Sequence, residues 1–253
     1  MFPNWIWYIL GKKSSGDSPT PPEPPTPVET PVVLPNGIKF GGSTWITLPD
    51  FIKKGDFSDV TTMKEMCNQN SYLTEFVLSD ETSQTTKNCI NCGSMFSYCG
   101  QLKKVGLFDT SNVTDFSYMF SYCYYLEDNI PLFNTSKVTT FYSCFRDCRK
   151  ITKIPQFDTS KNQNFNNCFV NCYALTDLPL LDSSEVINFG NMFSGTNNLS
   201  DTSLDNILQM CINATNYSGT KTLSTLSLSS GYDSRIVNLP HYQDFLDSGW
   251  IIR

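Results

Sequence analysis

Residues 108–179 read FDTSNVTDFSYMFSYCYYLEDNIP, FNTSKVTTFYSCFRDCRKITKIP and FDTSKNQNFNNCFVNCYALTDLP, three versions of one phrase separated by single residues. The phrases begin at Phe108, Phe133 and Phe157, and Leu181 begins a fourth, so the steps are 25, 24 and 24 residues. A fixed period of this length is typical of a solenoid, in which each unit buries its apolar face against its neighbours. The sequence therefore predicts a stack of similar coils around one core.

Side chains of one kind fall into columns when the phrases are aligned. The repeats begin near Val60, an insertion within 76–86 lengthens one step, and we count about six units over residues 59–199. Thr196 interrupts the Cys column. The two inner Phe columns, the Cys column and the aliphatic column contain Phe116, Phe141, Phe165 and Phe189; Phe96, Phe120, Phe145, Phe169 and Phe193; Cys99, Cys123, Cys148 and Cys172; and Leu102, Leu126, Ile151, Leu175 and Leu199.

The composition narrows the possible partners. The chain has 253 residues, a net charge of −6 and 17% charged residues, against roughly 25% in ordinary globular proteins. Asn, Ser and Thr, which suit turns, are abundant instead. The sequence has no run of five Lys or Arg residues, so we expect no nucleic-acid partner.

Most of the ten Cys residues follow the repeat. Cys144 and Cys168 stand where Met119 and Met192 stand in other units. Because each thiol replaces an apolar side chain, we expect buried, reduced thiols that pack as small apolar groups. Disulfides, which are frequent in small secreted domains, are the alternative interpretation.

Residues 1–10, MFPNWIWYIL, form a strongly apolar peptide. Its apolar run is shorter than the roughly 20 residues of a membrane span, and its flanks do not resemble a secretion signal. Its aromatic side chains favour an anchor held in a pocket of a partner protein, and folding back onto its own stack is the alternative. The expected anchor residues are Phe2, Trp5, Ile6, Trp7, Tyr8, Ile9 and Leu10.

Two segments connect this peptide to the repeats. Residues 11–31 are rich in Pro and favour extended polyproline II, which predicts a semi-rigid linker. Residues 32–58 read as an N-terminal cap, with a hairpin signal at Asn36 and Gly37 and a further strand in STWITLP. An anchor peptide, a spacer and a repeat domain together indicate a display arrangement.

Residues 200–253 read as a C-terminal cap. Apolar residues at helical spacing predict an amphipathic helix over 202–213, capped by Thr202 or Ser203. TLSTLSL has the spacing of a leucine-rich-repeat strand. HYQDFLDSGWII then predicts a short helix, a stop at Gly249 and a closing strand.

Each phrase also predicts its own local structure. Asp109 and Ser111 are typical residues of a turn. V-T-x-F-x-x-M-F spaces its apolar groups as a short α-helical or 3₁₀ stretch does. C-x-x-L-x-x-(I/L)-P predicts a short strand ended by Pro, and such strands from successive units would stack in parallel about 4.8 Å apart.

The pattern D-T-S-x-V-T-x-(F/M)-x-x-M-F-x-x-C-x-x-L resembles the BspA-like leucine-rich repeat family of bacterial surface proteins, from about Val60 to Leu199. The ending is similar to caps on such repeats in gut bacteria and their phages. The resemblance implies an α/β solenoid with short parallel strands, an N-terminal β cap and a C-terminal helix and strand cap. It implies binding of host or partner molecules, without catalysis or a cofactor. Asn162 and Gln163 replace Val-Thr of the pattern, which predicts one looser coil.

Catalytic and metal sites have weak support in the sequence. His241 is the single His, and nothing near it indicates a nucleophile. Cys89 and Cys92 have the spacing of a redox pair, and four further Cys have a spacing that suits zinc. Because the repeat produces these spacings, we expect no catalytic residue, metal or cofactor, and a zinc- or thiol-dependent enzyme is the remote alternative. The zinc alternative would use Cys144, Cys148, Cys168 and Cys172.

Residues between the Cys and aliphatic columns are expected to point outward on the strand face, where several are aromatic or basic. Such side chains stack on sugar rings or contact a protein, and Tyr and Arg are frequent in binding hot spots. A solvated face on which tyrosines only shield strand edges is the alternative. The candidate ligand-binding residues are Tyr98, Tyr122, Tyr124, Tyr125, Arg149, Lys150 and Tyr173.

We therefore expect a non-enzymatic display or adhesion protein with a surface-exposed repeat domain. Its anchor peptide would dock into a scaffold protein, and its repeat face would bind a glycan or protein on a host cell. A phage virion fibre or decoration protein on the virion surface is the favoured version, because residues 1–10 do not resemble a secretion signal. A bacterial cell-surface or secreted adhesin is the alternative.

Overall fold

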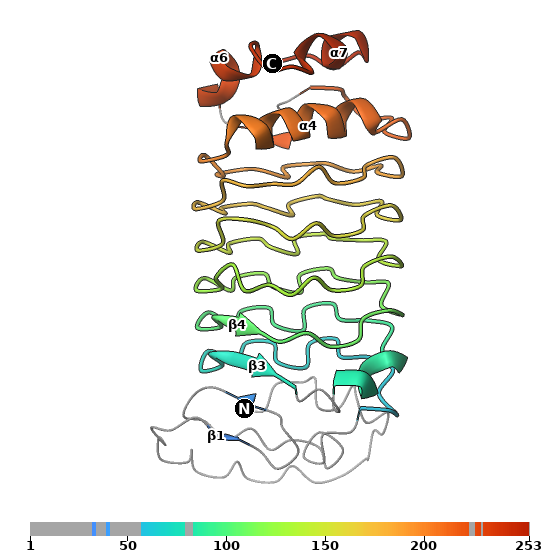
Figure 1. The fold of residues 1–253 in the computed structure, drawn as a ribbon, viewed down its shortest axis with the longest axis vertical. Coiled ribbons are helices and arrows are strands. Elements are labelled where there is room, and N and C mark those ends of the chain that lie inside the picture. Colours follow the sequence, from blue (N-terminus) through green and yellow to red (C-terminus); the bar gives the residue numbers. More distant parts are fainter. Residues whose placement is uncertain are drawn as a thin grey trace, which may run out of the picture.

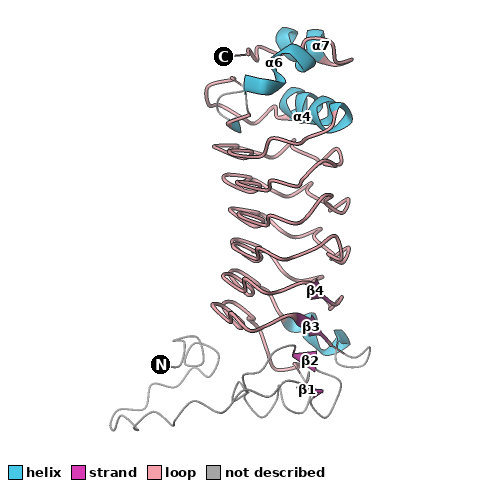
Figure 2. Cartoon of the chain, turned by 90° about the vertical axis from the view of Figure 1, so that its left-hand side faces the viewer, coloured by secondary structure: helices cyan, strands magenta, loops and turns pink. Residues whose placement is uncertain are grey.

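The computed structural model describes most of the repeats and the C-terminal cap. Coils of similar shape follow one another along a single axis, and helices lie beyond the last coil (Figures 1 and 2). The anchor peptide, the Pro-rich linker, the hairpin turn at Asn36 and Gly37 and the strand predicted in STWITLP lie outside the described residues. The described residues are 32–33, 39–40, 57–78, 83–222, 226–228 and 230–252.

A four-stranded sheet lies at the N-terminal end of the stack. β1 (Val32–Val33) pairs antiparallel with β2 (Lys39–Phe40), as the predicted hairpin requires. β2 pairs antiparallel with β3 (Glu75–Val77), and β3 pairs in parallel with β4 (Lys104–Val105). The change from antiparallel to parallel pairing therefore falls where the N-terminal cap meets the first coils.

The predicted strand after the Cys column is only partly present. It forms β3 and β4 in the first coils and a single parallel bridge from Lys153 to Asp177 further along. A longer parallel ladder lies elsewhere, at the residue before the Phe116 column. Side chains of the residues in this ladder accept a hydrogen bond from the backbone N–H group two residues later, as Asp115 Oδ1 does from Ser117 N at 2.8 Å. These Asx turns lead the chain into the turns that follow.

Consecutive β-turns replace the predicted helical stretch after each Phe116-type residue. Met119 N donates to Phe116 O at 3.2 Å, and the third residue of this turn, Tyr118, has a φ of 57°. A positive φ at that position is the signature of a type II turn. The same conformation recurs four residues later at Tyr122, with a φ of 62°.

Turns are favoured over a helix because every second backbone N–H group of this stretch donates to a carbonyl of the next coil. Tyr118 N donates to Tyr142 O at 2.8 Å, and Tyr122 N donates to Arg146 O at 2.7 Å. A helix would direct these N–H groups along its own axis and leave the neighbouring carbonyls without donors. The helical prediction was wrong because it considered one unit instead of the stack.

The turns give the stack two columns of residues with positive φ. Asn and Gly adopt this conformation readily, whereas a bulky side chain there costs about 1 kcal/mol. The coil-to-coil hydrogen bonds hold the bulky residues in place. The columns are Glu65, Ser94, Tyr118, Ser143, Asn167 and Asn191; and Gln69, Tyr98, Tyr122, Asp147, Asn171 and Gly195.

The Phe side chains superpose from coil to coil, as predicted. The rings of Phe120 and Phe145 lie 5.5 Å apart at 15°, and those of Phe145 and Phe169 lie 5.8 Å apart at 6°. Phe96 and Phe193 continue the column at its two ends. Each stacked pair adds about 0.5–1.5 kcal/mol to the burial of its rings. The column therefore forms a continuous spine inside the stack.

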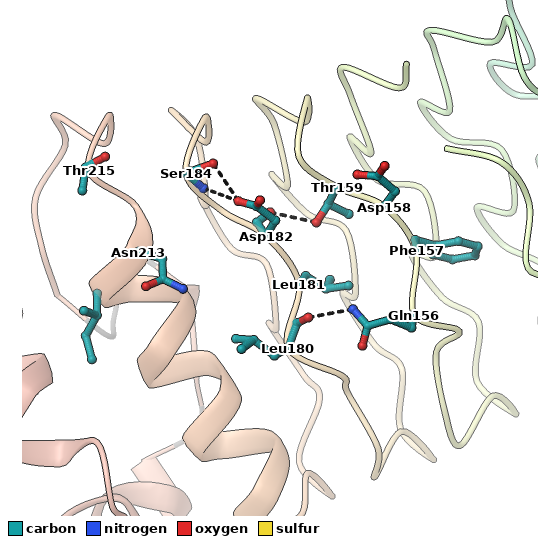
Figure 3. Close-up of a pocket in the computed structure, with 11 residues that line it drawn as sticks. Gln156, Phe157, Asp158, Thr159, Leu180, Leu181, Asp182, Ser184, Asn213 and Thr215 are labelled. Carbon is teal, nitrogen blue, oxygen red and sulfur yellow. Dashed lines mark hydrogen bonds between the residues drawn. The ribbon is translucent and has the colours of Figure 1, made fainter. Parts of the chain in front are cut away.

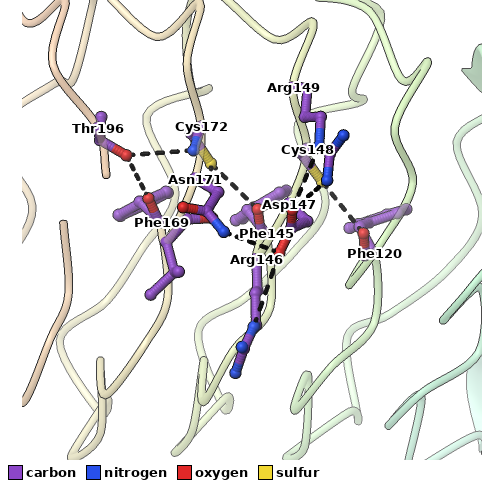
Figure 4. A network of polar contacts seen from close by, with 11 residues as sticks. Phe120, Phe145, Arg146, Asp147, Cys148, Arg149, Phe169, Asn171, Cys172 and Thr196 are labelled. Carbon is purple, nitrogen blue, oxygen red and sulfur yellow. Dashed lines mark hydrogen bonds and ion pairs between the residues drawn. The ribbon is translucent and has the colours of Figure 1, made fainter. Parts of the chain in front are cut away.

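All ten Cys are free and buried, so the prediction of inward-facing thiols is confirmed. Those of the Cys column are also hydrogen-bond donors, as Cys148 Sγ is to Phe120 O at 3.1 Å (Figure 4). Thr196 donates to Phe169 O in the equivalent position. The Cys column is therefore polar as well as apolar, which explains why Thr can replace Cys in the last coil.

The C-terminal helix forms over nearly the predicted residues, as α4 (Asp201–Asn213). The predicted caps were wrong, because Ser200 is the N-cap and its side chain accepts from Ser203 N at 3.2 Å. Ser203 Oγ instead donates to Thr176 O and accepts from Leu178 N, each at 2.8 Å. This side chain therefore ties the helix to the preceding coil.

Short elements complete the described chain: η1 (Thr85–Asn88), η2 (Ser230–Tyr232), α6 (Asp233–Ile236) and α7 (Tyr242–Asp247). Residues 223–225 of the strand predicted in TLSTLSL lie outside the described residues; after them, Leu226 O accepts from Phe193 N and so extends the last coil. The predicted closing strand is present as a parallel bridge between Ile251 and Thr222. Within the described ranges, no helix has the length and apolarity needed to cross a membrane.

Candidate ligand-binding face

The predicted binding residues lie at a corner of the coils instead of on a strand face. Tyr124 and Tyr125 form a turn between the Cys column and the aliphatic column, and Arg149 and Lys150 form the equivalent turn one coil further on. The structure brings Tyr98, Tyr122, Tyr124, Arg149 and Tyr173 into contact in pairs. Tyr125 and Lys150 are exposed beside them, and no described ring or ion pair links them to that group.

Two tyrosine rings from adjacent coils stack at the N-terminal end of this corner. The rings of Tyr98 and Tyr122 are 4.3 Å apart at 11°, and Tyr98 is 50% exposed. Burial raises the pKa of Tyr122, and the nearby Arg146 opposes this shift. Both residues have positive φ, so the corner presents flat apolar rings from a backbone conformation that disfavours them.

Arg149 lies between two further tyrosines. Its guanidinium carbon is 4.4 Å from the ring centre of Tyr124 and 5.8 Å from that of Tyr173. A cation over an aromatic face contributes about 0.5–1 kcal/mol at an exposed site. Hydrogen bonding to Asp147 raises the pKa of Arg149, so the guanidinium is charged at every physiological pH.

Asp147 holds the arginines, and the sequence interpretation missed it. Its side chain is only 4% exposed. Arg149 donates to Asp147 Oδ1 from Nη2 at 2.9 Å and from Nε at 3.3 Å, while Asn171 Nδ2 donates to Oδ2 at 3.2 Å. Arg146 Nε lies 3.8 Å from the same Oδ2 (Figure 4), and its guanidinium lies over the Tyr122 ring. One buried carboxylate thus fixes two arginines from its own coil.

A second missed pair extends this surface. The rings of Tyr118 and Tyr142 meet edge to face 4.9 Å apart. The hydrogen bond with Tyr142 raises the pKa of Tyr118 to about 12. Both residues belong to repeat columns that can be seen in the sequence. The prediction missed them because it considered mainly the residues between the Cys and aliphatic columns, and both lie before the Cys column. We call the whole surface the tyrosine–arginine face: Tyr98, Tyr118, Tyr122, Tyr124, Tyr142, Arg146, Arg149 and Tyr173.

A different surface is hollowed near the C-terminal cap, with a volume of about 840 Å³ (Figure 3). Asp158 and Asp182 line it, and each accepts from a backbone N–H two residues on. Hydrogen bonds from Ser160 lower the pKa of Asp158. Asp109 makes the same bond in an earlier coil, as the predicted turn requires. The carboxylates of this groove are therefore parts of the repeat turns.

The possible chemistry elsewhere is limited in the described residues. His241 Nδ1 lies 2.8 Å from Asp205 Oδ2, and no described Ser, Thr or Cys side chain hydrogen-bonds to that ring. Burial raises the pKa of Cys144 and Cys168, as expected for thiols packed among apolar side chains. In the part of the chain that the structure describes, no three His, Cys, Asp or Glu side chains form a metal-binding group.

Residues 90–207 match a family model described as Mycoplasma protein of unknown function, DUF285. This family is related to the BspA-like surface repeat proteins. The matched segment contains every residue of the tyrosine–arginine face and the first half of α4. Neither a curated protein nor a solved structure gave a significant match.

Proposed function

Starting from this match to a family related to surface repeat proteins, we propose that the chain is a non-enzymatic display and adhesion protein. Its coils form a BspA-like leucine-rich-repeat solenoid whose tyrosine–arginine face binds a glycan or a protein on a host cell. Residues 1–10 anchor the chain in a larger assembly, and the Pro-rich linker projects the solenoid from it. The assembly that we favour is a phage virion, in which the chain is a fibre or decoration protein.

The observation that supports binding is the arrangement around Asp147. Removing a carboxylate from water can cost more free energy than a paired cation returns, and a tyrosine at a positive-φ position costs more than the Asn or Gly of other coils. Both occur in the coils that display Arg149 and its tyrosines, whereas the equivalent positions of the last coils are Asn171 and Gly195. Structural costs that serve only an exposed surface are typical of functional sites.

The stack also makes the surface rigid. Backbone hydrogen bonds run from coil to coil directly beneath the face, as from Tyr122 N to Arg146 O at 2.7 Å. A rigid face loses little conformational entropy when a ligand binds. Large exposed rings such as those of Tyr98 and Tyr173 then contribute most of their contact area to affinity.

Binding of the labelled chain to a panel of bacterial and epithelial cells tests this function. Replacing Tyr124, Tyr125 and Tyr173 together by Ser is expected to abolish binding while the thermal unfolding midpoint changes little, because Tyr125 and Tyr173 are exposed and Tyr124 is only half-buried. Tyr72→Ser is the matched control, since Tyr72 is 56% exposed at the corner of the first coil. Unchanged binding by the triple variant would refute the proposed face.

A bacterial surface or secreted adhesin is the second candidate, and the family description favours it by naming a bacterium, Mycoplasma. The binding face would be the same, and only the anchoring assembly would differ. Mass spectrometry of purified virions and of bacterial envelope fractions separates the two candidates. Peptides of this chain in virions support the phage assembly, and peptides only in the envelope replace it with the adhesin.

A further inference from the structure

Resting on the proposed function, we infer that the tyrosine–arginine face binds an acidic polysaccharide, with Arg149 receiving a sugar carboxylate and the tyrosines contacting the sugar rings. This inference names the ligand class that the proposed function leaves open. Three observations support it. The Arg149 guanidinium is fixed in place and has N–H groups without a described acceptor, the charge around it is positive, and the backbone N–H groups beneath it are already hydrogen-bonded.

The guanidinium of Arg149 is held in place by some of its N–H groups, while others remain available to a ligand. A guanidinium has five N–H groups, and Asp147 accepts from Nε and from Nη2. The other N–H groups have no described acceptor, and the side chain is 47% exposed. Arg binds carboxylates through two parallel N–H bonds. The free edge of Arg149 therefore suits one planar acid group of a ligand.

Asp147 and the two flanking rings fix the plane of that guanidinium. The Tyr124 and Tyr173 rings lie within 4.4 Å and 5.8 Å of its carbon, and Asp147 is fixed in turn by Asn171. A side chain that is ordered before binding loses less entropy on binding. Asp147 is thus a positioning residue, although its negative charge opposes an acidic ligand.

The surrounding charge is positive in a chain whose net charge is −6. Arg146, Arg149 and Lys150 come from five consecutive residues. Arg146 pairs with Asp147 at 3.8 Å, whereas no described acidic group pairs with exposed Lys150. These cations surround exposed tyrosine rings. Cations beside flat apolar rings match a ligand that carries both acid groups and C–H faces, which describes a uronic-acid polysaccharide.

An acidic peptide fits the same surface less well. Peptides dock by adding a strand to a free sheet edge or by filling an apolar groove. Here Tyr118 N and Tyr122 N already donate to the next coil, and the described groove lies elsewhere, near the C-terminal cap. A linear polysaccharide is itself a repeat, so its successive sugars can meet equivalent corners of successive coils.

Calorimetry with the full chain in about 150 mM salt, where long-range attraction is screened, tests the inference on matched polymers. The probes are oligomers of polygalacturonate, the same oligomers with their carboxylates methyl-esterified, and poly-glutamate of similar length. We expect the acid form to bind about tenfold or more tightly than the ester. Equal affinity for acid and ester, or tighter binding of poly-glutamate, would overturn the inference.

Two variants separate geometry from net charge. Arg149→Lys keeps the charge but loses the planar donor edge, and we expect its affinity for the acid oligomer to fall about tenfold. Asp147→Asn makes the surface more positive, and Asn tolerates positive φ, yet its affinity should also fall because Arg149 is no longer fixed. Stronger binding by Asp147→Asn, or unchanged binding by Arg149→Lys, would show simple charge attraction and refute the inference. Lys161→Gln, in another turn of the coil, is the control and should change little.

The cell-binding experiment keeps the two proposals apart. If cells bind the parent chain and lose it with the triple Tyr→Ser variant while no acidic oligomer binds, the ligand class is wrong and the adhesion function stands. If cells do not bind the parent chain at all, the adhesion function fails whatever the oligomers do.

Discussion

The coils that carry Tyr98 and Tyr122 and the coils that carry Asn171 and Gly195 share one backbone but differ on the outside. All four residues occupy the same column with positive φ. Asn and Gly fit that conformation at little cost, whereas tyrosines do not. The inner Phe column continues unchanged through both regions. The interior side chains therefore determine the fold, and the corner side chains can differ between coils without changing the backbone.

Breaking the interior should therefore cost far more than changing the exterior. Phe145 is 1% exposed and stacks on a ring in each neighbouring coil. Phe145→Ala is expected to lower the free energy of unfolding by about 3–5 kcal/mol, because a cavity opens at both coil interfaces. Urea unfolding followed by circular dichroism measures this.

The matched exterior change is Tyr173→Ala, since Tyr173 is 45% exposed. It should change the free energy of unfolding by less than about 0.5 kcal/mol. Similar losses for both variants would mean that interior and exterior are not separable in this stack.

The second comparison concerns the positive-φ column itself. A Cβ atom added at Gly195, where φ is 76°, would lie 2.4 Å from Asn171 Oδ1. Gly195→Ala should therefore destabilise the chain by about 1–2 kcal/mol in the same unfolding experiment. Gly100→Ala is the control, because its Cβ would meet only a Tyr124 ring carbon at 3.2 Å and its φ is ordinary. An equal effect at Gly100 would argue that crowding, and not φ, sets the cost.

One coil carries a buried polar side chain, Asn162, at a position where neighbouring coils carry Val. Asn162 is fully buried where Val113 and Val138 stand in other coils, and its Nδ2 has no partner. Its backbone N still donates to Thr159 O at 2.9 Å, so the looser coil expected from this departure is not evident in the backbone. Asn162→Val should raise the free energy of unfolding by about 1 kcal/mol. A loss of stability instead would show that the bond to Asn164 N outweighs the unpaired amide.

The smallest effect concerns the tyrosines with shared hydrogen bonds. Tyr118 has a pKa of about 12, above its ordinary value of 10.0, because of its bond to Tyr142. Because the folded pKa is raised, the stabilisation is fully present below pH 10 and is lost as the pH rises toward 12. The difference between the ultraviolet tyrosinate titrations of the parent and Tyr118→Phe should show one phenol titrating near 12. A difference centred near pH 10 would contradict the shared bond.

The sequence predicted the interior well because the interior repeats. Most coils place Phe, Cys and an aliphatic side chain at the same spacing, so burial of Phe145 or Cys148 follows from alignment alone. The turns could not be predicted in the same way. Tyr118 and Tyr122 have positive φ because neighbouring coils supply their hydrogen bonds, and no property of tyrosine itself indicates that conformation.

The candidate face was predicted only in part for a similar reason. Tyr124, Arg149 and Tyr173 were identifiable from their columns, but Asp147 stands where other coils carry Tyr, Asn, Gln or Gly. Its role depends on two arginines of its own coil and on Asn171 of the next. Such a role appears only when the coils are stacked in three dimensions.

Cell binding of the Tyr124, Tyr125 and Tyr173 triple Ser variant, recorded together with its unfolding midpoint, tests the central claim most directly. We predict that attachment disappears while the midpoint stays within a few degrees of the parent. Retained attachment by a stably folded variant would contradict a stack that recognises its ligand through the tyrosine–arginine face.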